Sequence, residues 1–341
     1  GLTLPNNRMP PKQFRGLPVY RCFNAVALDR YTDWSKLGQS DMDEQAKRLK
    51  AWQIAIQPTW THFGRVTSAD PARNHDRLSL LGPADLRDAV LARIELASVF
   101  DPAPDAFDVY ADFLKQDLIE RKLGQGMLLR MFDRAESGRP QASHGLRVRD
   151  AISLQTGREM VNTIQKLELR QVPFDHVTIE QTFAKSVQAG SLKRMLDEYV
   201  GSLPVPVTLV GFEAGGRSPV ASAIMMETVL RLVFAQPNIS GIYFAGLVEG
   251  DLIEDNAALL DGDGEPTAAG NVLDGLFHRA WTSDETGQTD ERGNENLRVF
   301  AGWHNITATL PDGTTIKTEA YIPKSDRPKL IVLQATAAEA E

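Results

Sequence analysis

The sequence predicts an α/β protein, a (β/α)8 TIM barrel with a C-terminal antiparallel β appendage. The first observation is that short β-prone runs alternate with longer helical stretches along most of the chain. The second is that this alternation ends after Trp281, where a hairpin-like pattern takes over. Strands separated by helices pair in parallel through right-handed crossovers, and eight such repeats close into a barrel.

Eight strands are expected, the first near Leu2–Pro5, with a loop rich in Arg, Asn and Asp after the third. The helices are marked by apolar residues at helical spacing, as in Met42, Ala46, Leu49 and Trp52. The other strands are expected at 22–28, 54–60, 107–111, 146–151, 177–183, 205–212 and 241–247, and the main helices at 41–52, 84–100, 157–170, 191–200 and 223–234.

The C-terminal segment RVFAGWHNITATLPDGTTIKTEAYI has the alternation of antiparallel strands. Its turn is expected at Pro311, Asp312 and Gly313, residue types that favour tight turns. Residues 1–282 are therefore expected to form the barrel. Residues 283–341 are expected to form the β appendage and a tail packed on the barrel.

Composition and charge exclude several classes of function. With 42% hydrophobic and 24% charged residues, the chain has the composition of an ordinary globular protein. Its net charge of -8 comes without a basic stripe, so no nucleic-acid partner is expected. No apolar run reaches the roughly 20 residues that span a bilayer. Cys22 is the single cysteine and the six histidines lack metal-binding spacing, so no disulfide, metal or other cofactor is expected.

Two N-glycosylation acceptor triplets occur, Asn238-Ile239-Ser240 and Asn305-Ile306-Thr307. They are typical of a secreted glycoprotein, and we expect the chain to be extracellular. The opening GLTLPNN lacks an initiator methionine, which favours a mature or excised segment.

Several motifs carry a family resemblance. They are FNAV with Trp34 following, KLGQGMLLRMFDRA at 122–135, and LLDGDGEPTAAGNVLDGLFHRAWTSDETGQTDERGNENLRVFAGWHNITA from Leu259 onward. With these motifs in order from Gly1 to about Thr309, the chain resembles glycoside hydrolase family 10, the endo-β-1,4-xylanase family, especially its plant and animal type. The resemblance implies a retaining hydrolase with two carboxylates about 5–5.5 Å apart on opposite barrel strands.

The acid/base position of the family is altered here. The family pattern is W-D-V-N-N-E, whereas this chain reads FDVYAD, which puts Ala111 at the asparagine and Asp112 at the glutamate. Aspartate is one methylene shorter, and a misplacement of about 1 Å can cost on the order of a hundredfold in rate. Asp112 is therefore either a shortened remnant of the catalytic acid or an N-cap of the helix FLKQDLIERKL.

The nucleophile position is lost more completely. In LPVPVTLVGFE an ungapped match puts Leu209 where the family has glutamate, and a two-residue shift puts Gly211 there. Glu213 and Glu180, at other strand ends, are candidate substitutes that would pair with Asp112. The alternative for both is an ion pair with a neighbour such as Arg149 or Arg217.

The sugar-holding positions implied by the resemblance also differ from the family. Trp34 and Trp60 either stack on a sugar ring or pack within the barrel. The positions in question are Asp29, Arg30, Asp33, Trp34, Thr59, Trp60, Arg149, Thr182 and Ala245.

The sequence therefore predicts a family 10-like domain with absent or strongly impaired catalysis, in an extracellular glycoprotein. Its role would be to bind a polysaccharide or glycan, or to act as a structural scaffold for protein assembly partners. The alternative is an active retaining endo-β-1,4-xylanase-like glycosidase with a rearranged carboxylate pair.

Overall fold

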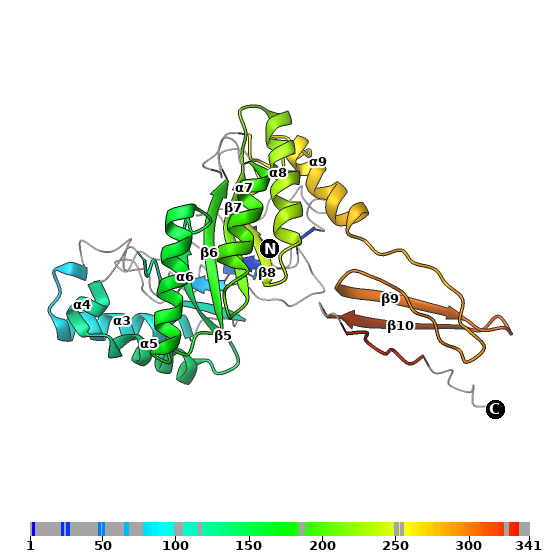
Figure 1. Ribbon diagram of the computed structural model, residues 1–341. Helices are drawn as coiled ribbons and strands as arrows, with labels where there is room; N and C mark the ends of the chain where they lie inside the picture. Colours follow the sequence, from blue (N-terminus) through cyan, green and yellow to red (C-terminus); the bar gives the residue numbers. More distant parts are fainter. Residues whose placement is uncertain are drawn as a thin grey trace. The chain divides into compact units, whose positions relative to one another are not determined.

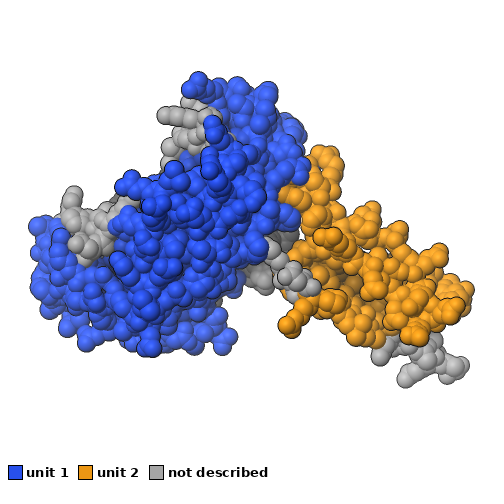
Figure 2. Space-filling view, viewed as in Figure 1, with its two compact units in different colours: residues 1–274 blue, residues 275–341 orange. Residues whose placement is uncertain are grey.

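The computed structural model divides the chain into two compact units, Gly1–Asp274 and Gly275–Glu341 (Figure 2). The two units are described separately below. The residues that the structure describes are 2–3, 22–23, 25–27, 47–48, 50–51, 65–67, 78–98, 105–114, 118–183, 188–248, 252, 256–323 and 327–333.

The first unit is built on one parallel sheet of eight strands, in the order β2-β1-β8-β7-β6-β5-β4-β3. The two strands at the ends of this order, β2 and β3, contact one another, so the order is cyclic and the predicted barrel is confirmed. The strands are β1 (Leu2–Thr3), β2 (Val26–Ala27), β3 (Arg65–Thr67), β4 (Ala106–Ala111), β5 (Ser143–Arg149), β6 (His176–Phe183), β7 (Val207–Ala214) and β8 (Ile239–Phe244).

Around the third strand, the sequence prediction was wrong in placing Arg65–Thr67 within a loop. The strand predicted at 54–60 lies outside the described residues, whereas Arg65–Thr67, placed in the polar loop, forms β3. Arg65 pairs with Ala106 and Thr67 with Asp108 of β4, in parallel register. Pairing with β4 satisfies the backbone of this segment, and the β-branched Val66 and Thr67 favour a strand despite the polar surroundings.

Helices cover the outer side of the strands, and Figure 1 shows α6, α7 and α8 side by side there. Ser153 and Ser218 begin α6 and α8 as N-caps, accepting from the backbone N–H of Thr156 and Ala221. The helices are α3 (Pro83–Ser98), α4 (Leu118–Leu123), α5 (Gly126–Gly138), α6 (Leu154–Leu169), α7 (Ala189–Met195), α8 (Pro219–Phe234) and α9 (Ala268–Gly275), with π-helical turns η3 (Leu196–Val200) and η4 (Leu276–Ala280) after α7 and α9.

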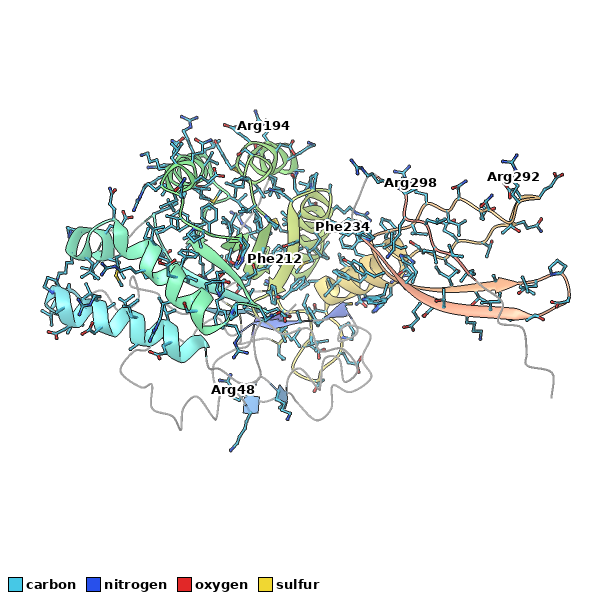
Figure 3. All side chains as sticks on the ribbon, turned by 90° about the horizontal axis from the view of Figure 1, so that it is seen from below. Arg48, Arg194, Phe212, Phe234, Arg292 and Arg298 are labelled. Carbon is cyan, nitrogen blue, oxygen red and sulfur yellow. The ribbon has the colours of Figure 1, made fainter. Side chains whose placement is uncertain are left out.

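The core of the first unit lies between the strands and the helices. Phe212 is in ring contact with Phe183 and Phe244, at centroid distances of 5.6 and 5.1 Å. Figure 3 shows Phe212 in the middle of the strands, whereas Arg194 projects from α7 away from them. Among the described residues, no helix is both long and apolar enough to cross a membrane.

The second unit contains the predicted antiparallel hairpin, β9 (Gly302–Thr309) and β10 (Thr315–Ile322). The turn lies at the predicted place: Gly313 has a φ of 86°, and Asp312 accepts from the Thr314 N–H at 2.8 Å. Glycine is the residue that adopts such a backbone without strain, so the turn residues determine where the strands reverse.

Candidate functional site

The strands β4, β5 and β6 carry polar side chains on one common face. The register places Asp108 beside Gly145, and Gly145 beside His176. The Thr178 hydroxyl of β6 donates to Asp108 Oδ1 of β4 at 2.5 Å, although β5 lies between these strands. A contact that passes over the middle strand spans the concave side of a curved sheet, so this face is the barrel interior.

At the N-terminal end of the interior, His176 is held between Ser143 and Asp108. Ser143 Oγ lies 2.7 Å from His176 Nδ1, and His176 Nε2 lies 3.1 Å from Asp108 Oδ1. Gly145 is required here, because a Cβ at this position would lie 2.2 Å from the imidazole. In the neutral ring, Nε2–H donates to Asp108 and Nδ1 accepts the Ser143 hydroxyl. Ser143 and His176 begin their strands, at the end of a barrel that supports stability rather than catalysis.

Two arginines of β5 link three carboxylates toward the C-terminal end of the interior. Arg147 binds Glu180 Oε2 at 2.8 Å and lies 4.0 Å from Asp108 Oδ2. Arg149 binds the same Glu180 oxygen at 2.8 Å and Asp112 Oδ2 at 2.7 Å. The predicted ion pair between Glu180 and Arg149 is therefore confirmed. We call these five residues the arginine–carboxylate cluster.

The cluster is largely withdrawn from solvent. The side chains of Asp108, Asp112 and Arg147 are at most 3% exposed, and those of Arg149 and Glu180 are 19% and 23% exposed. Charges removed from water must be compensated by neighbours, and here each carboxylate has a guanidinium within 4.0 Å. The charged groups at this end of the barrel are thus directed at one another.

Asp112 follows the last residue of β4, as predicted for the acid/base position, but it does not cap a helix. Phe113 and Leu114, which directly follow it, form a turn rather than a helix, so the N-cap alternative is wrong. Asp112 instead has a φ of 57°, its backbone N–H donates to the Arg147 carbonyl at 2.8 Å, and its carboxylate binds Arg149. Arg149, which the resemblance predicts at a sugar-holding position, is thus an ion-pair partner of Asp112.

The strand β7 contains a bulge that changes which face of the sheet its C-terminal side chains occupy. Leu209 pairs with Ile179 of β6, and both alternate with interior residues, so Leu209 faces the helices. Between the pairs Glu180↔Val210 and Thr182↔Glu213, β7 has one residue more than β6. The extra residue is accommodated at Gly211, whose φ is 58°.

This bulge returns Glu213 to the interior. Thr182 lies two residues after Glu180 on β6 and therefore shares its face, and Glu213 is in register with Thr182. Without the extra residue Glu213 would face the helices, since side chains alternate along a strand. Its side chain is buried, with 2% of its surface exposed. The strands β4 and β7 thus each keep one carboxylate at the C-terminal end of the interior.

The remaining predicted sugar-cleft residues are only partly described. Thr182 lies in the interior beside Glu213, and the backbone N–H of Ala245 donates to the Phe212 carbonyl at 3.0 Å after the end of β8. The positions that lie outside the described residues are Asp29, Arg30, Asp33, Trp34, Thr59 and Trp60.

The two glycosylation triplets lie in different surroundings. Asn238 precedes β8, where its side-chain amide donates to the Val200 carbonyl and its Oδ1 is buried without a hydrogen-bond partner in the described part of the chain. Asn305 lies in the middle of β9 with an exposed side chain. The backbone geometry therefore leaves room for a glycan at Asn305, whereas one at Asn238 would displace a buried amide.

In two titratable groups outside the cluster, burial is the main cause of a shifted pKa. Burial lowers the pKa of His144, against the opposing effect of the Glu136 and Asp175 carboxylates. Burial, together with the charge of Asp274, raises the pKa of the Cys22 thiol to about 12. Cys22 is therefore a neutral thiol at physiological pH and is not a nucleophile. Within the described ranges, no three His, Cys, Asp or Glu side chains are grouped so that they could hold a metal ion.

Sequence reasoning missed the interior residues Asp108, Arg147, His176 and Thr178. Their signal is present as polar residues at a spacing of two within buried strands, in LRVR of β5 and HVTIE of β6. A spacing of two places such residues on one face of a strand, and in a barrel that face is either the interior or the helix layer. The pattern therefore predicts a shared polar face even where no motif is recognised.

No family model matches the chain. Among curated proteins, endo-1,4-beta-xylanase 3 of Arabidopsis thaliana is 22% identical over 262 residues, which are 75% of this chain and 34% of that protein. The chain thus spans about a third of the length of the curated relative it matches.

Solved structures of xylanases share the fold. Xylanase 10B from Thermotoga maritima has a TM-score of 0.62 at 14% identity, covering 82% of this chain and 95% of that one. Xylanase 10B from Thermotoga petrophila, in complex with xylobiose, has a TM-score of 0.63 at 12% identity, covering 82% and 94%. A psychrophilic glycoside hydrolase family 10 endo-beta-1,4-xylanase has a TM-score of 0.60 at 12% identity, covering 74% and 88%.

The first unit is therefore a (β/α)8 barrel with the fold of these solved xylanases. The resemblance to glycoside hydrolase family 10 predicted from the motifs is thus confirmed at the level of the fold.

Proposed function

We propose that this chain is a catalytically inactive or strongly impaired family 10-like domain of an extracellular glycoprotein. In this proposal the barrel binds a polysaccharide or glycan, or serves as a scaffold for protein assembly partners. Its xylanase relatives supply the substrate class, because xylobiose is bound in one of them. Fold does not carry activity once the site residues are replaced, so the proposal rests on the site.

The observation that carries the proposal is the ion pair between Asp112 and Arg149, at 2.7 Å. A general acid must hold a proton to give to the leaving oxygen, and a bound guanidinium stabilises the carboxylate without one. Asp112 is also 2% exposed and bonded through its backbone to Arg147. The carboxylate at the acid position is thus engaged by a guanidinium, which supports the proposed loss of its acid role.

The bulge at Gly211 favours a second candidate, an active retaining glycosidase in which Asp112 is the acid/base and Glu213 the nucleophile. Glu213 lies on the interior face of β7, which is separated from β4 by the two strands β6 and β5. A retaining mechanism needs two carboxyl groups about 5–5.5 Å apart across the substrate. This candidate requires Arg149 to release Asp112 when substrate binds.

The deciding experiment measures reducing sugar released from xylan, mixed-linkage glucan and aryl β-glycosides by the purified chain. We expect no release above the level of buffer. The variants Asp112→Asn and Glu213→Gln keep the side-chain shapes and should give the same baseline. Turnover by the native chain that is lost in both variants would establish the second candidate instead.

Binding and scaffolding are separated by a ligand screen. Aromatic side chains can hold sugars by stacking, and Trp60 is a candidate from the sequence, so binding on a glycan array that is lost in Trp60→Ala would support a binding role. Self-association of the purified chain, or its recovery within a larger assembly, without glycan binding would support a scaffold.

A further inference from the structure

One face of the β9–β10 hairpin brings an acceptor asparagine beside two aromatic rings. The register pairs Trp303 with Tyr321, Asn305 with Glu319, and Thr307 with Lys317. All six side chains belong to the exposed set of an alternating pattern, so they lie on the same side of the two strands. We call these six residues the aromatic face of the hairpin, whose strands β9 and β10 are labelled in Figure 1.

The aromatic face exposes two large aromatic side chains to solvent. Trp303 is 53% exposed and Tyr321 is 47% exposed, with ring centroids 5.6 Å apart and ring planes inclined at 58°. No described residue after Leu276 is fully buried, so the hairpin has no buried core in this part of the chain. A two-stranded sheet is marginally stable alone in water, and exposed aromatic rings gain from being covered.

We infer that Asn305 carries an N-linked glycan whose first N-acetylglucosamine packs on Trp303 and Tyr321. This inference rests on the proposal that the chain is an extracellular glycoprotein. The donor is a lipid diphosphate-linked oligosaccharide of the secretory pathway. The Asn305 side-chain nitrogen forms a bond to the sugar C1, the C1–oxygen bond to the lipid diphosphate breaks, and the amide gives up one proton.

The position of the Asn305-Ile306-Thr307 triplet indicates that the first sugar of its glycan covers the two rings. Asn305 is two residues from Trp303 on the same strand, about 6.5–7 Å away, and diagonal to Tyr321 at roughly 7–8 Å. The two rings therefore lie within the reach of the first sugar attached to Asn305. The carbon–hydrogen face of a pyranose covers an aromatic ring, and Glu319, directly opposite Asn305, can accept from the N-acetyl N–H. Thr307, which completes the triplet, is exposed on the same face.

The second triplet provides an internal control. The side-chain amide of Asn238 donates to the Val200 carbonyl. Ser240, the third residue of this triplet, donates to the Val207 carbonyl at 3.1 Å. A glycan on Asn238 would be attached to the same nitrogen that donates to the Val200 carbonyl. It would also have no aromatic pair beside it among the described residues of the strand. The structure therefore favours Asn305 over Asn238.

The test uses the full chain, produced with an added secretion signal in a glycosylating eukaryotic host. Peptide mass spectrometry is expected to find a glycan on Asn305 and none on Asn238, and Thr307→Ala is expected to remove it. The glycan is then trimmed to one N-acetylglucosamine carrying a ¹³C-labelled acetyl methyl. In the native chain this methyl signal should be shifted upfield by the ring currents of Trp303 and Tyr321. The shift should be lost in Trp303→Ala and kept in Phe300→Ala, which removes an exposed ring just before β9.

An unoccupied Asn305 in the secreted chain would overturn the inference. An acetyl methyl signal that is the same in the native chain, in Trp303→Ala and in urea would overturn the packing on the rings. Neither result bears on the xylan assay, whose outcome depends on the barrel. Conversely, xylan turnover would overturn the proposed loss of catalysis and leave the glycan at Asn305 in place.

Discussion

The two faces of the sheet formed by β4, β5, β6 and β7 differ in what they contribute. The outer face carries apolar side chains such as Leu146, Ile179 and Leu209, which are fully buried against the helices. The interior face carries Asp108, Arg147, His176, Thr178 and Glu180, which bond to one another. The same strands therefore hold the fold together on one side and keep the polar layout of a site on the other.

The difference shows where stability arises. Each large apolar side chain buried on the outer face contributes about 1.5–3 kcal/mol. On the interior face, desolvation of each charge offsets most of its attraction to a partner, so the cluster adds little net stability. What the cluster does is fix the positions of five charged groups.

The largest effect is expected from Arg147→Met, which leaves the buried Asp108 and the partly exposed Glu180 without this guanidinium. Removing one partner of a buried ion pair costs about 3–5 kcal/mol, because the remaining charge stays out of water. Urea unfolding monitored by circular dichroism measures this loss. The matched control is Arg134→Met, which breaks an exposed pair with Glu95 and should cost less than about 1 kcal/mol. Equal losses in the two variants would show that the interior charges are not electrostatically coupled to the fold.

A smaller effect is expected at the β7 bulge, which changes the face of the sheet on which the side chains after it lie. Gly211 has a φ of 58°, so Gly211→Ala forces a side chain into the left-handed region at a cost of about 1–2 kcal/mol. The control is Gly241→Ala in β8, where the added Cβ meets its nearest neighbour at an ordinary 3.6 Å and no left-handed φ is involved. Thermal unfolding of the two variants compares them. A loss at Gly241 that matches the loss at Gly211 would mean that the bulge is not held by glycine.

Sequence predicted the fold of the barrel well because its signals are repeated. The segments that form β4, β6 and β7 are rich in apolar and β-branched residues, and segments with helical periodicity lie between the predicted strands. Eight such strand–helix repeats predict a closed barrel. The sequence did not predict a strand at Arg65–Thr67, because this segment is short and lies among polar residues. Only its pairing with β4 identifies it as a strand.

The site was harder to predict, because it depends on which face of each strand a side chain occupies and not only on where the residue stands in the sequence. The placement of Asp112 at the end of β4 followed from the motif, but its partner Arg149 belongs to another strand. The face of Glu213 depends on a single extra residue, and one inserted residue reverses every side chain after it. Gly211 within a strand was the available signal, since an isolated glycine in a strand often marks a bulge.

The last prediction concerns His144, the titratable exception on the outer face. Its ring stacks on Phe107 at 6.0 Å, Nδ1 lies 3.2 Å from the Glu136 carboxylate, and Nε2 is buried without a hydrogen-bond partner among the described residues. Burial lowers the pKa of His144 in the folded chain below its ordinary value of 6.5, so the unfolded chain binds the proton more readily. The stability present above pH 6.5 is therefore lost progressively as the pH falls below it.

Urea unfolding at pH 7.5 and pH 5.5 tests this dependence. The native chain should lose more stability on acidification than His144→Leu, which cannot titrate, because only the native chain must protonate a buried ring or unfold. The exposed His278 serves as the control, and His278→Leu should follow the native chain. If His144→Leu and the native chain lose the same amount, the Glu136 and Asp175 carboxylates offset the burial, and the outer face tolerates a charge much as the interior does.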